Sequence, residues 1–440
     1  MPPIGIPASF WRGGTSRGLL FRAEHLAPFP PNVREGIIFT ALGSPDPAGR
    51  QISGLGGGVS SLSKVAIVSV PGEAHAEQDR FGPLPGVSWA DDGERNGQRW
   101  DIVYRFAQVG VKKAELDWSA SCGNMFSAAA ATSITSALLP YTTLWDRARS
   151  LPRPSPGDPL LFPLSILSAS NGVLMRARVP IDPSTLQLWE PAPGEGVEIA
   201  GVPGRDEPGI EVEMPLEQDD GSAAGGLVTG RARDVVKLDA GGEVAVSLLT
   251  SGLPNIFLPL ESLAALDGYS FPEDLLTLSA SDLATHPTLS PLLERIRLAA
   301  AAQFSIPSSL ASPKIVLIAP IPTAGYTTSS GKRIAREDAD LLVRAVSSGD
   351  WHASIPGTTL GALNIGAGVA GSVVHEAIHG AGHTTVTRDG VVEVRAAHAA
   401  GVTESAVRFD DGIARSVVMV RTAREIMRGE VMVPERVLRG

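Results

Sequence analysis

The 440-residue sequence contains little cysteine, few aromatic residues and less positive than negative charge. Its one cysteine, Cys122, excludes a disulfide framework within the chain and fits a reducing compartment. Lys and Arg number 37 against 47 Asp and Glu, and the resulting net charge of −10 argues against a nucleic-acid surface. No apolar run approaches the roughly 18 residues of a membrane helix, and no secretory signal precedes the first motif. We therefore expect a cytoplasmic protein without a nucleic-acid or membrane partner.

The remaining composition is that of a folded, turn-rich protein. Apolar residues make up 43% of the chain and charged residues 19%, which is typical of globular proteins. The length predicts two or three domains. Pro and Gly concentrate at 190–209, where we place a domain junction. We expect a first domain over 1–200, a second over 201–417, and a C-terminal segment, about 418–440, that packs back on the first.

Short runs rich in Val and Ile dominate and predict strands at 65–70, 100–108, 173–179, 243–249, 314–318 and 391–395. Helical patterns are fewer and lie at 124–139, 289–303, 338–347 and 422–427. The polar segment 72–98 predicts a long hairpin. Each half also holds one small-residue segment, "CGNMFSAAAATSITSALL" and "GTTLGALNIGAGVAG", so the pattern indicates an internal duplication.

Three glycine-flanked polar turns in the first half carry the candidate chemistry. They are "RGGTSRG" at 12–18, "GLGGGVSSLSK" at 54–64 and "SCGNM" at 121–125. Glycines let a ligand approach the backbone closely, and hydroxyl and free N–H groups then bind anions. A lysine at the start of a strand usually extends into water, and a lone cysteine before a helix is usually a small buried apolar residue. The co-occurrence of three such turns with cations and a thiol favours a functional site containing Lys64 and Cys122.

Two other motifs compete with this interpretation. "GLGGG" resembles a dinucleotide loop, but the apolar strand follows the glycines instead of preceding them, and we reject that function. "HEAIH", His375 to His379, matches the zinc-hydrolase pattern, which works only on a helix. Because Ser372, Val373 and Val374 favour a strand and position 385 is Thr385, zinc hydrolysis remains only an alternative function.

The motifs together resemble the PrpF family of 2-methylaconitate, methylitaconate and aconitate isomerases and 4-oxalomesaconate tautomerases. The three polar turns look like its N-terminal signatures, in order. Further matches include "TGRARDVV" (229–236), "SGLPNIFLP" (251–259), "ASPKIVLIAP" (311–320), "WHASI" (351–355) and "RTAREIMRGEVMVP" (421–434). The likeness covers nearly the whole chain.

This resemblance implies an α+β fold of the diaminopimelate-epimerase type. Two pseudo-symmetric domains would each wrap an antiparallel barrel-like sheet around a central helix, with the active site in the cleft between them. The implied activity is a 1,3-proton shift, seen as double-bond migration or cis–trans isomerisation, on a small unsaturated di- or tricarboxylic acid, without a cofactor or a metal. A homodimer is the assembly we allow for.

The resemblance also implies the site residues. Lys64 and Cys122 are the expected catalytic residues, with Lys64 serving as the base if burial lowers its pKa toward neutrality. Backbone N–H groups of Gly123 and Asn124 would hold a carboxylate. The expected substrate-binding residues are Thr15, Ser16, Arg17, Ser61, Ser63, Gly123, Asn124, Met125, His352 and Thr358.

Three departures from the family pattern leave the substrate open. The family usually has Asn where this chain has Ser121, the turn at Pro356–Leu360 differs, and the excursion at 72–98 is longer than usual. With one cysteine, a two-thiol racemase is excluded, whereas a one-thiol racemase of the same fold remains an alternative. The residues do not decide whether Cys122 moves a proton or only lines the pocket.

Overall fold

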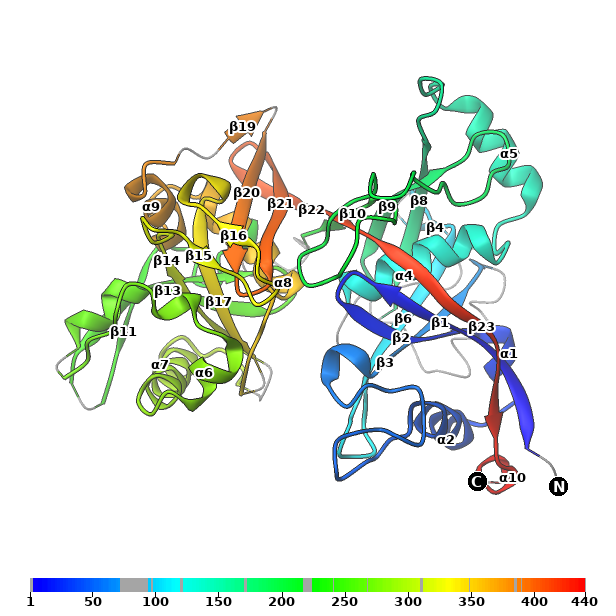
Figure 1. Cartoon of the computed structure of the whole chain (residues 1–440), viewed down its shortest axis with the longest axis horizontal. Coiled ribbons are helices and arrows are strands. Elements are labelled where there is room, and N and C mark those ends of the chain that lie inside the picture. The colour runs from blue at the N-terminus through cyan, green and yellow to red at the C-terminus, as the bar shows by residue number, and fades with distance from the viewer. Residues whose placement is uncertain are drawn as a thin grey trace. The chain divides into compact units, whose positions relative to one another are not determined.

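The computed structural model describes residues 3–71, 94–95, 98–118, 122–169, 172–216, 224–239, 241–266, 268–308, 312–347, 349–383, 386–388 and 390–439. The chain forms two compact units. Unit 1 contains Met1–Met214 and Val420–Gly440, and unit 2 contains Pro215–Met419. The C-terminal strand therefore returns to the unit in which the chain began, and Figure 1 shows it running beside the first strand.

Eight main strands form the sheet of unit 1. They are β1 (Ile4–Gly13), β2 (Ser16–Arg22), β3 (Lys64–Ser69), β6 (Ile102–Val109), β8 (Leu160–Ser168), β9 (Leu174–Ile181), β10 (Ile210–Pro215) and β23 (Ala423–Val433). Along the sheet they pair in the order β23-β1-β2-β3-β6-β8-β9-β10. The pairs β2–β3 and β6–β8 are parallel and the others are antiparallel.

Unit 2 repeats this arrangement with eight strands of its own. They are β11 (Asp234–Lys237), β12 (Glu243–Thr250), β13 (Pro254–Pro259), β14 (Lys314–Ala319), β17 (Leu341–Ser347), β20 (Val391–His398), β21 (Gly401–Asp410) and β22 (Ile413–Arg421). They pair in that same order, and the parallel pairs are β13–β14 and β17–β20. The sequence of antiparallel and parallel pairs is identical in the two units, so β3 corresponds to β14 and β6 to β17.

Each sheet surrounds one buried helix. In unit 1 this helix is α4 (Gly123–Thr135), which contacts β1, β2, β3, β6, β9 and β23. In unit 2 it is α8 (Gly357–Gly368), which contacts β12, β13, β20 and β21. Small side chains allow strands to approach a helix from several sides, which explains why both helices consist mainly of Ala, Gly, Ser and Thr.

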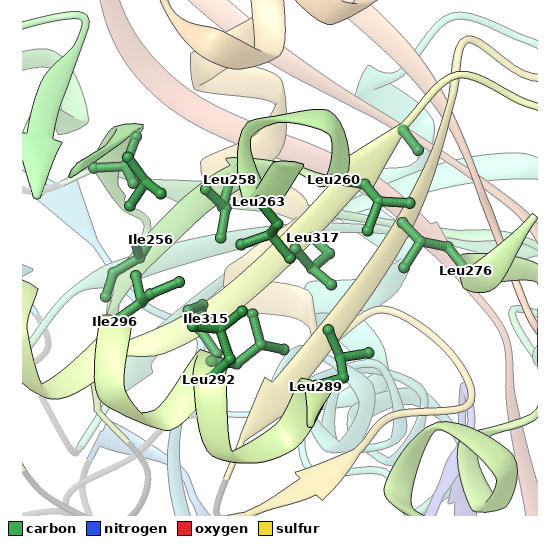
Figure 2. Close-up of a cluster of buried hydrophobic side chains, with 14 of the residues drawn as sticks. Ile256, Leu258, Leu260, Leu263, Leu276, Leu289, Leu292, Ile296, Ile315 and Leu317 are labelled. Carbon is green, nitrogen blue, oxygen red and sulfur yellow. The ribbon is translucent and has the colours of Figure 1, made fainter. Parts of the chain in front are cut away.

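The other face of each sheet carries a separate hydrophobic core. In unit 2, α7 (Leu289–Gln303) lays Leu289, Leu292 and Ile296 against side chains of β13 and β14, as Figure 2 shows. In unit 1, α2 (Pro31–Leu42) packs its apolar face against Val65 and Ile67 of β3. Because side chains alternate along a strand, the residues between these core positions face the central helix instead.

Shorter elements complete the two units. Unit 1 also contains α1 (Ala23–Leu26), β4 (Glu94–Arg95), β5 (Gln98–Arg99), β7 (Leu116–Asp117), α5 (Tyr141–Ser150) and α10 (Glu435–Leu438). Unit 2 also contains α6 (Ala280–Thr285), β15 (Tyr326–Thr327), β16 (Arg333–Ile334), β18 (Asp350–Trp351), α9 (Val373–Gly380) and β19 (Val386–Arg388).

The structure corrects two predicted helices, which are strands. Most of the segment 338–347 forms β17, which pairs with β14 on one side and with β20 on the other. The described side chains of β17 are mostly buried. Residues 422–427 belong to β23, which pairs with β1 at ten positions. Both segments have locally helical composition, but pairing with distant strands outweighs this weak local preference.

The segment containing "HEAIH" differs in the opposite sense. It forms the helix α9 instead of the expected strand. Ser372 caps the N-terminus of this helix by accepting a hydrogen bond from the His375 backbone N–H (3.0 Å). Val373, Val374 and Ile378 anchor one face of α9 in the core.

Two further expectations about organisation differ from the structure. The sheets contain two parallel pairs each, so they are not wholly antiparallel. Along the chain, the first part of unit 1 ends at Met214, whereas we expected the boundary near residue 200. The Pro/Gly-rich segment belongs to unit 1 because its Glu207 pairs with Arg12 (3.0 Å). The predicted hairpin at 72–98 lies mostly outside the described residues, as does Ser121.

Among the described residues, no single helix is long and apolar enough to cross a membrane. The helices α8 and α9 are together long and apolar enough, but the chain bends between them. Most of their residues are buried inside unit 2.

Candidate active site

The first polar turn joins β1 to β2 and lies against the N-terminus of α4. A side chain at Gly13 would overlap the Asn124 carbonyl oxygen, and one at Gly14 would overlap the Asn124 side chain. Gly14 also has a positive φ of 49°. The two glycines are therefore required for the close approach of hairpin and helix. In return, Asn124 Nδ2 donates to the hydroxyls of Thr15 and Ser16, each at 3.2 Å.

The C-terminal segment fixes the same turn from the other side. The Gly14 N–H donates to the Thr422 carbonyl (2.8 Å), and Arg12 donates to the Thr422 hydroxyl (2.8 Å). The neighbouring Arg421 is buried; burial lowers its pKa to about 10, and its interaction with the Cys122 side chain opposes this shift. A residue more than 400 positions from the hairpin thus interacts electrostatically with the thiol.

Lys64 is the first residue of β3 and is only 9% exposed. Val65 and Ile67 face the core under α2, so alternation directs Lys64 to the side of α4. Its Nζ donates to Gln108 Oε1 (2.6 Å) and lies 5.2 Å from the centroid of the Phe106 ring. A side chain at Gly18 would crowd the Lys64 backbone on the neighbouring strand.

The Gln108 side chain has only one orientation that satisfies its amide. Its Nε2 donates to the carbonyls of Ser60 and Ser63, both at 2.9 Å. The amide oxygen must therefore face Lys64, which holds the lysine Nζ in one place.

One face of β6 connects Lys64 with Cys122. Tyr104, Phe106 and Gln108 alternate along the strand and so share that face. Gln108 and Phe106 contact the Lys64 head group, while the Tyr104 hydroxyl donates to the Cys122 carbonyl (3.0 Å). The Tyr104 and Phe106 rings stack at 6.4 Å. Burial raises the pKa of Tyr104 well above its ordinary value, so the hydroxyl remains a donor.

Cys122 occupies the N-cap position of α4, with extended backbone dihedrals and a half-buried side chain. Among the described residues no side chain caps this helix end, although the first turn of a helix has free N–H donors. Gly123 and Asn124 open the helix, and Met125 is fully buried behind them. The arrangement can bind a carboxylate beside the thiol.

Arg17 of the first polar turn and two serines of the second polar turn are the remaining predicted residues of unit 1. Arg17 lies 5.8 Å from the Phe10 ring, and its buried Nε has no hydrogen-bond partner among the described residues. Ser61 is half-buried in a short 3-10 turn. Ser63 is fully buried, and its hydroxyl accepts from Gln51 Nε2 (2.8 Å), which ties the serine to the rest of the loop.

The two remaining predicted residues belong to unit 2. His352 follows β18 and donates its backbone N–H to the Ala345 carbonyl (3.0 Å). Thr358 lies in the first turn of α8 and accepts a hydrogen bond from Lys314 Nζ (2.6 Å). Burial lowers the pKa of Lys314 to about 8.

The zinc motif does place both histidines on one face of α9, with ring centroids 4.1 Å apart. Burial and the neighbouring His379 lower the pKa of His375. Glu376 forms an ion pair with Arg233. Within the described part of the chain, no group of three His, Cys, Asp or Glu residues could hold a metal ion.

Sequence reasoning missed four residues near the predicted ones, namely Tyr104, Gln108, Lys314 and Arg421. Gln108 and Tyr104 carried a signal, since they lie four positions apart in a strand pattern and therefore on the same face. Lys314 repeats the position of Lys64 before an apolar strand. Arg421 carried no local signal of its electrostatic interaction with Cys122.

Known proteins resemble this chain over its whole length. The family model described as PrpF protein matches residues 3–81 and 94–434. A 2-methyl-aconitate isomerase from Shewanella oneidensis is 31% identical over 448 residues, covering 99% of this chain and 98% of that protein. A 3-methylitaconate isomerase from Eubacterium barkeri is 26% identical over 430 residues, covering 97% of each.

A solved structure shares the fold. The crystal structure of a methylitaconate-delta-isomerase matches with a TM-score of 0.70 and 24% sequence identity, covering 100% of this chain and 98% of the other. This match confirms the predicted fold class.

Proposed function

The chain belongs to the PrpF family, and on this basis we propose that it catalyses a 1,3-proton shift on a small unsaturated di- or tricarboxylic acid. The family membership confirms the prediction made from the three polar turns. The relatives are named as isomerases of 2-methyl-aconitate and 3-methylitaconate, both of which are unsaturated carboxylic acids. The chain is accordingly an isomerase. A reducing compartment, the cytoplasm, fits its single free thiol.

The single observation that supports the residue assignment is the shared face of β6. It brings the head group of Lys64 and the backbone of Cys122 over one row of side chains inside unit 1. A proton shift between two carbons needs a group that takes a proton from one carbon and returns it to the other. It also needs fixed donors for the negative charge that develops on the carboxylate or keto group.

In this proposal Lys64 takes the proton from one carbon and returns it two atoms away. Gln108 keeps Nζ in place during both transfers. The N–H groups of Gly123 and Asn124, at the uncapped end of α4, bind the carboxylate that accepts the electron density. The buried Nε of Arg17, which lacks a protein partner among the described residues, is a further donor for a substrate oxygen.

A panel of unsaturated acids tests the proposal. Purified protein is incubated with aconitate, 2-methylaconitate, methylitaconate and oxalomesaconate in deuterated buffer, and proton NMR follows the products. We expect one acid to isomerise with deuterium at the carbon that gains hydrogen. The absence of both double-bond migration and cis–trans isomerisation with every acid would contradict the proposal.

The same preparation separates the two alternatives. A zinc hydrolase would lose its activity on chelation with EDTA and regain it with zinc, whereas we expect no loss. A one-thiol racemase would exchange a proton on a saturated stereocentre without moving a double bond, and the NMR spectrum distinguishes the two reactions.

A further inference from the structure

The histidine motif of α9 has no part in the proposed reaction. His375 and His379 lie four positions apart on this helix of unit 2. Residues at that spacing are neighbours on one helix face, and the two ring centroids are 4.1 Å apart with the ring planes inclined at 42°. The helix therefore presents two imidazole groups side by side.

The packing of α9 leaves this pair open to solvent. Val374 and Ile378 each precede one of the histidines by one position, and both are buried in the core of unit 2. One residue turns an α-helix by about 100°, so the histidines lie at the border of the buried face. His375 is half-buried and His379 is exposed. A small ion can thus reach both rings from the solvent.

The ring nitrogens of the pair are not used by the rest of the fold. Neither imidazole forms a hydrogen bond or an ion pair with any residue that the structure describes, and the rings contact each other. His398, in contrast, uses both ring nitrogens in hydrogen bonds, one with the Thr403 hydroxyl (2.8 Å) and one with the Ala400 N–H (3.2 Å). His375 and His379 therefore keep their nitrogen lone pairs for a ligand from outside the chain.

Two imidazoles in this arrangement match the coordination geometry of a metal ion. Nitrogens bound to one ion at about 2.1 Å lie roughly 3 Å apart. Rings with centroids 4.1 Å apart can present two nitrogens at that separation. Because one helix carries both ligands, the second nitrogen binds intramolecularly once the first has bound, which strengthens the complex.

The residue between the histidines is engaged elsewhere. Glu376 forms an ion pair with Arg233. Within the described ranges no third His, Cys, Asp or Glu joins the pair to complete a metal centre. Since catalytic zinc has three protein ligands, water would fill the remaining positions here, and the ion would be exchangeable and outside any hydrolytic chemistry.

We propose that His375 and His379 form a two-ligand site for one divalent transition-metal ion on the surface of unit 2. Imidazole suits Ni²⁺, Cu²⁺ and Zn²⁺, whereas Mg²⁺ and Ca²⁺ require oxygen ligands. The bound ion links two successive turns of α9 and stabilises the folded unit. The site shares no residue with the proposed reaction.

Calorimetric titration of the full chain with Ni²⁺ tests the site. The protein carries no histidine tag, and a buffer at pH 7.5 keeps ordinary imidazoles, with a pKa near 6.5, mostly neutral. Ni²⁺ serves as the probe because, unlike Cu²⁺, it does not oxidise the free thiol of Cys122. We expect one equivalent to bind with a micromolar Kd and to raise the Tm of the wild type.

Three variants locate the binding. His379→Gln and His375→Gln should each weaken Ni²⁺ binding at least about tenfold, because one of two protein ligands is lost. The exposed position of His379 keeps the fold intact if His375→Gln is unstable. His286→Gln, which removes the lone histidine at the end of α6, is the matched control and should bind like the wild type.

The inference is overturned if the wild type binds no Ni²⁺, or if His379→Gln binds it as tightly as the wild type. Turnover of the unsaturated acid should be equal in the wild type and in His379→Gln. A loss of turnover in this folded variant would place the pair in the reaction and would also overturn the inference. Metal binding and turnover are measured separately, so the site and the proposed function can fail independently.

Discussion

Among single residues, Lys64 has the most defined surroundings, because Gln108 and Phe106 fix its head group. We expect Lys64→Ala to lower kcat at least about 100-fold, the usual scale for losing a general base. Proton NMR measures the turnover of the variant, and circular dichroism checks that the variant is folded. Lys113→Ala, which removes an exposed lysine of unit 1, should leave turnover unchanged. A folded Lys64 variant with near-normal kcat would remove this residue from the mechanism.

Cys122 contacts the described site mainly through its backbone, since the Tyr104 hydroxyl binds its carbonyl. We therefore expect the thiol to line the pocket, and Cys122→Ser should keep kcat within about tenfold of the wild type. Alkylation with iodoacetamide should nevertheless block turnover by bulk, and substrate should protect the thiol. A loss of about 100-fold or more in Cys122→Ser would instead make the thiol a proton carrier, because a serine hydroxyl is a far weaker acid.

Lys314 predicts a pH-dependent change in stability. Its pKa is about 8 in the folded protein against 10.5 as the ordinary value, so the unfolded chain binds the extra proton between these limits. The penalty for the buried charge is full below pH 8, declines as the pH rises, and is gone above 10.5. Lys314→Met should therefore stabilise the protein near neutral pH by up to about 3 kcal/mol. Urea unfolding at several pH values should show this gain shrinking above pH 8; a gain that stays constant would contradict the shift.

At the scale of elements, the contact between the β1–β2 hairpin and α4 depends on glycine. Gly13→Ala would drive a methyl group into the Asn124 carbonyl, and backbone cannot yield as a flexible side chain can. We expect a loss of at least about 2 kcal/mol in the free energy of unfolding. Gly429→Ala, in β23 of the same sheet, meets nothing within 4 Å and should be neutral or slightly stabilising. Equal effects of the two variants would show that the close approach is not required.

For the whole molecule, the return of the C-terminus to unit 1 is the decisive connection. β23 pairs with β1 from Ile4 to Gly13, and Thr422 binds both Arg12 and Gly14. Truncation after Val420 should therefore abolish the cooperative unfolding of unit 1 and all turnover. Truncation after Val433 removes only α10 and should retain both. Thermal unfolding followed by circular dichroism checks the pair, and a stable unit 1 without β23 would contradict the expectation.

Part of this molecule was predictable because its signals are local. The polar turns, the strand beginning at Lys64, the buried small-residue helices and the helix over 289–303 all follow from composition and periodicity within short windows. The motifs identified the family, and the family implied the fold class. The position of Lys64 alone left open whether its side chain extends into water or lies inside the protein, and the structure buries it.

The rest was decided by pairing between distant segments, which local periodicity does not encode. β17 is a strand because β14 and β20 flank it, and β23 is one because β1 receives it. Gln108 meets Lys64 only through the register of β3 with β6, and Arg421 approaches Cys122 only because the chain returns. The correspondence of Lys314 with Lys64 likewise emerges from two identical strand orders. The sequence by itself thus determined the family and named the candidate residues, whereas the tertiary structure determined which of those residues meet, because side-chain contacts across a sheet depend on register and on alternation of faces.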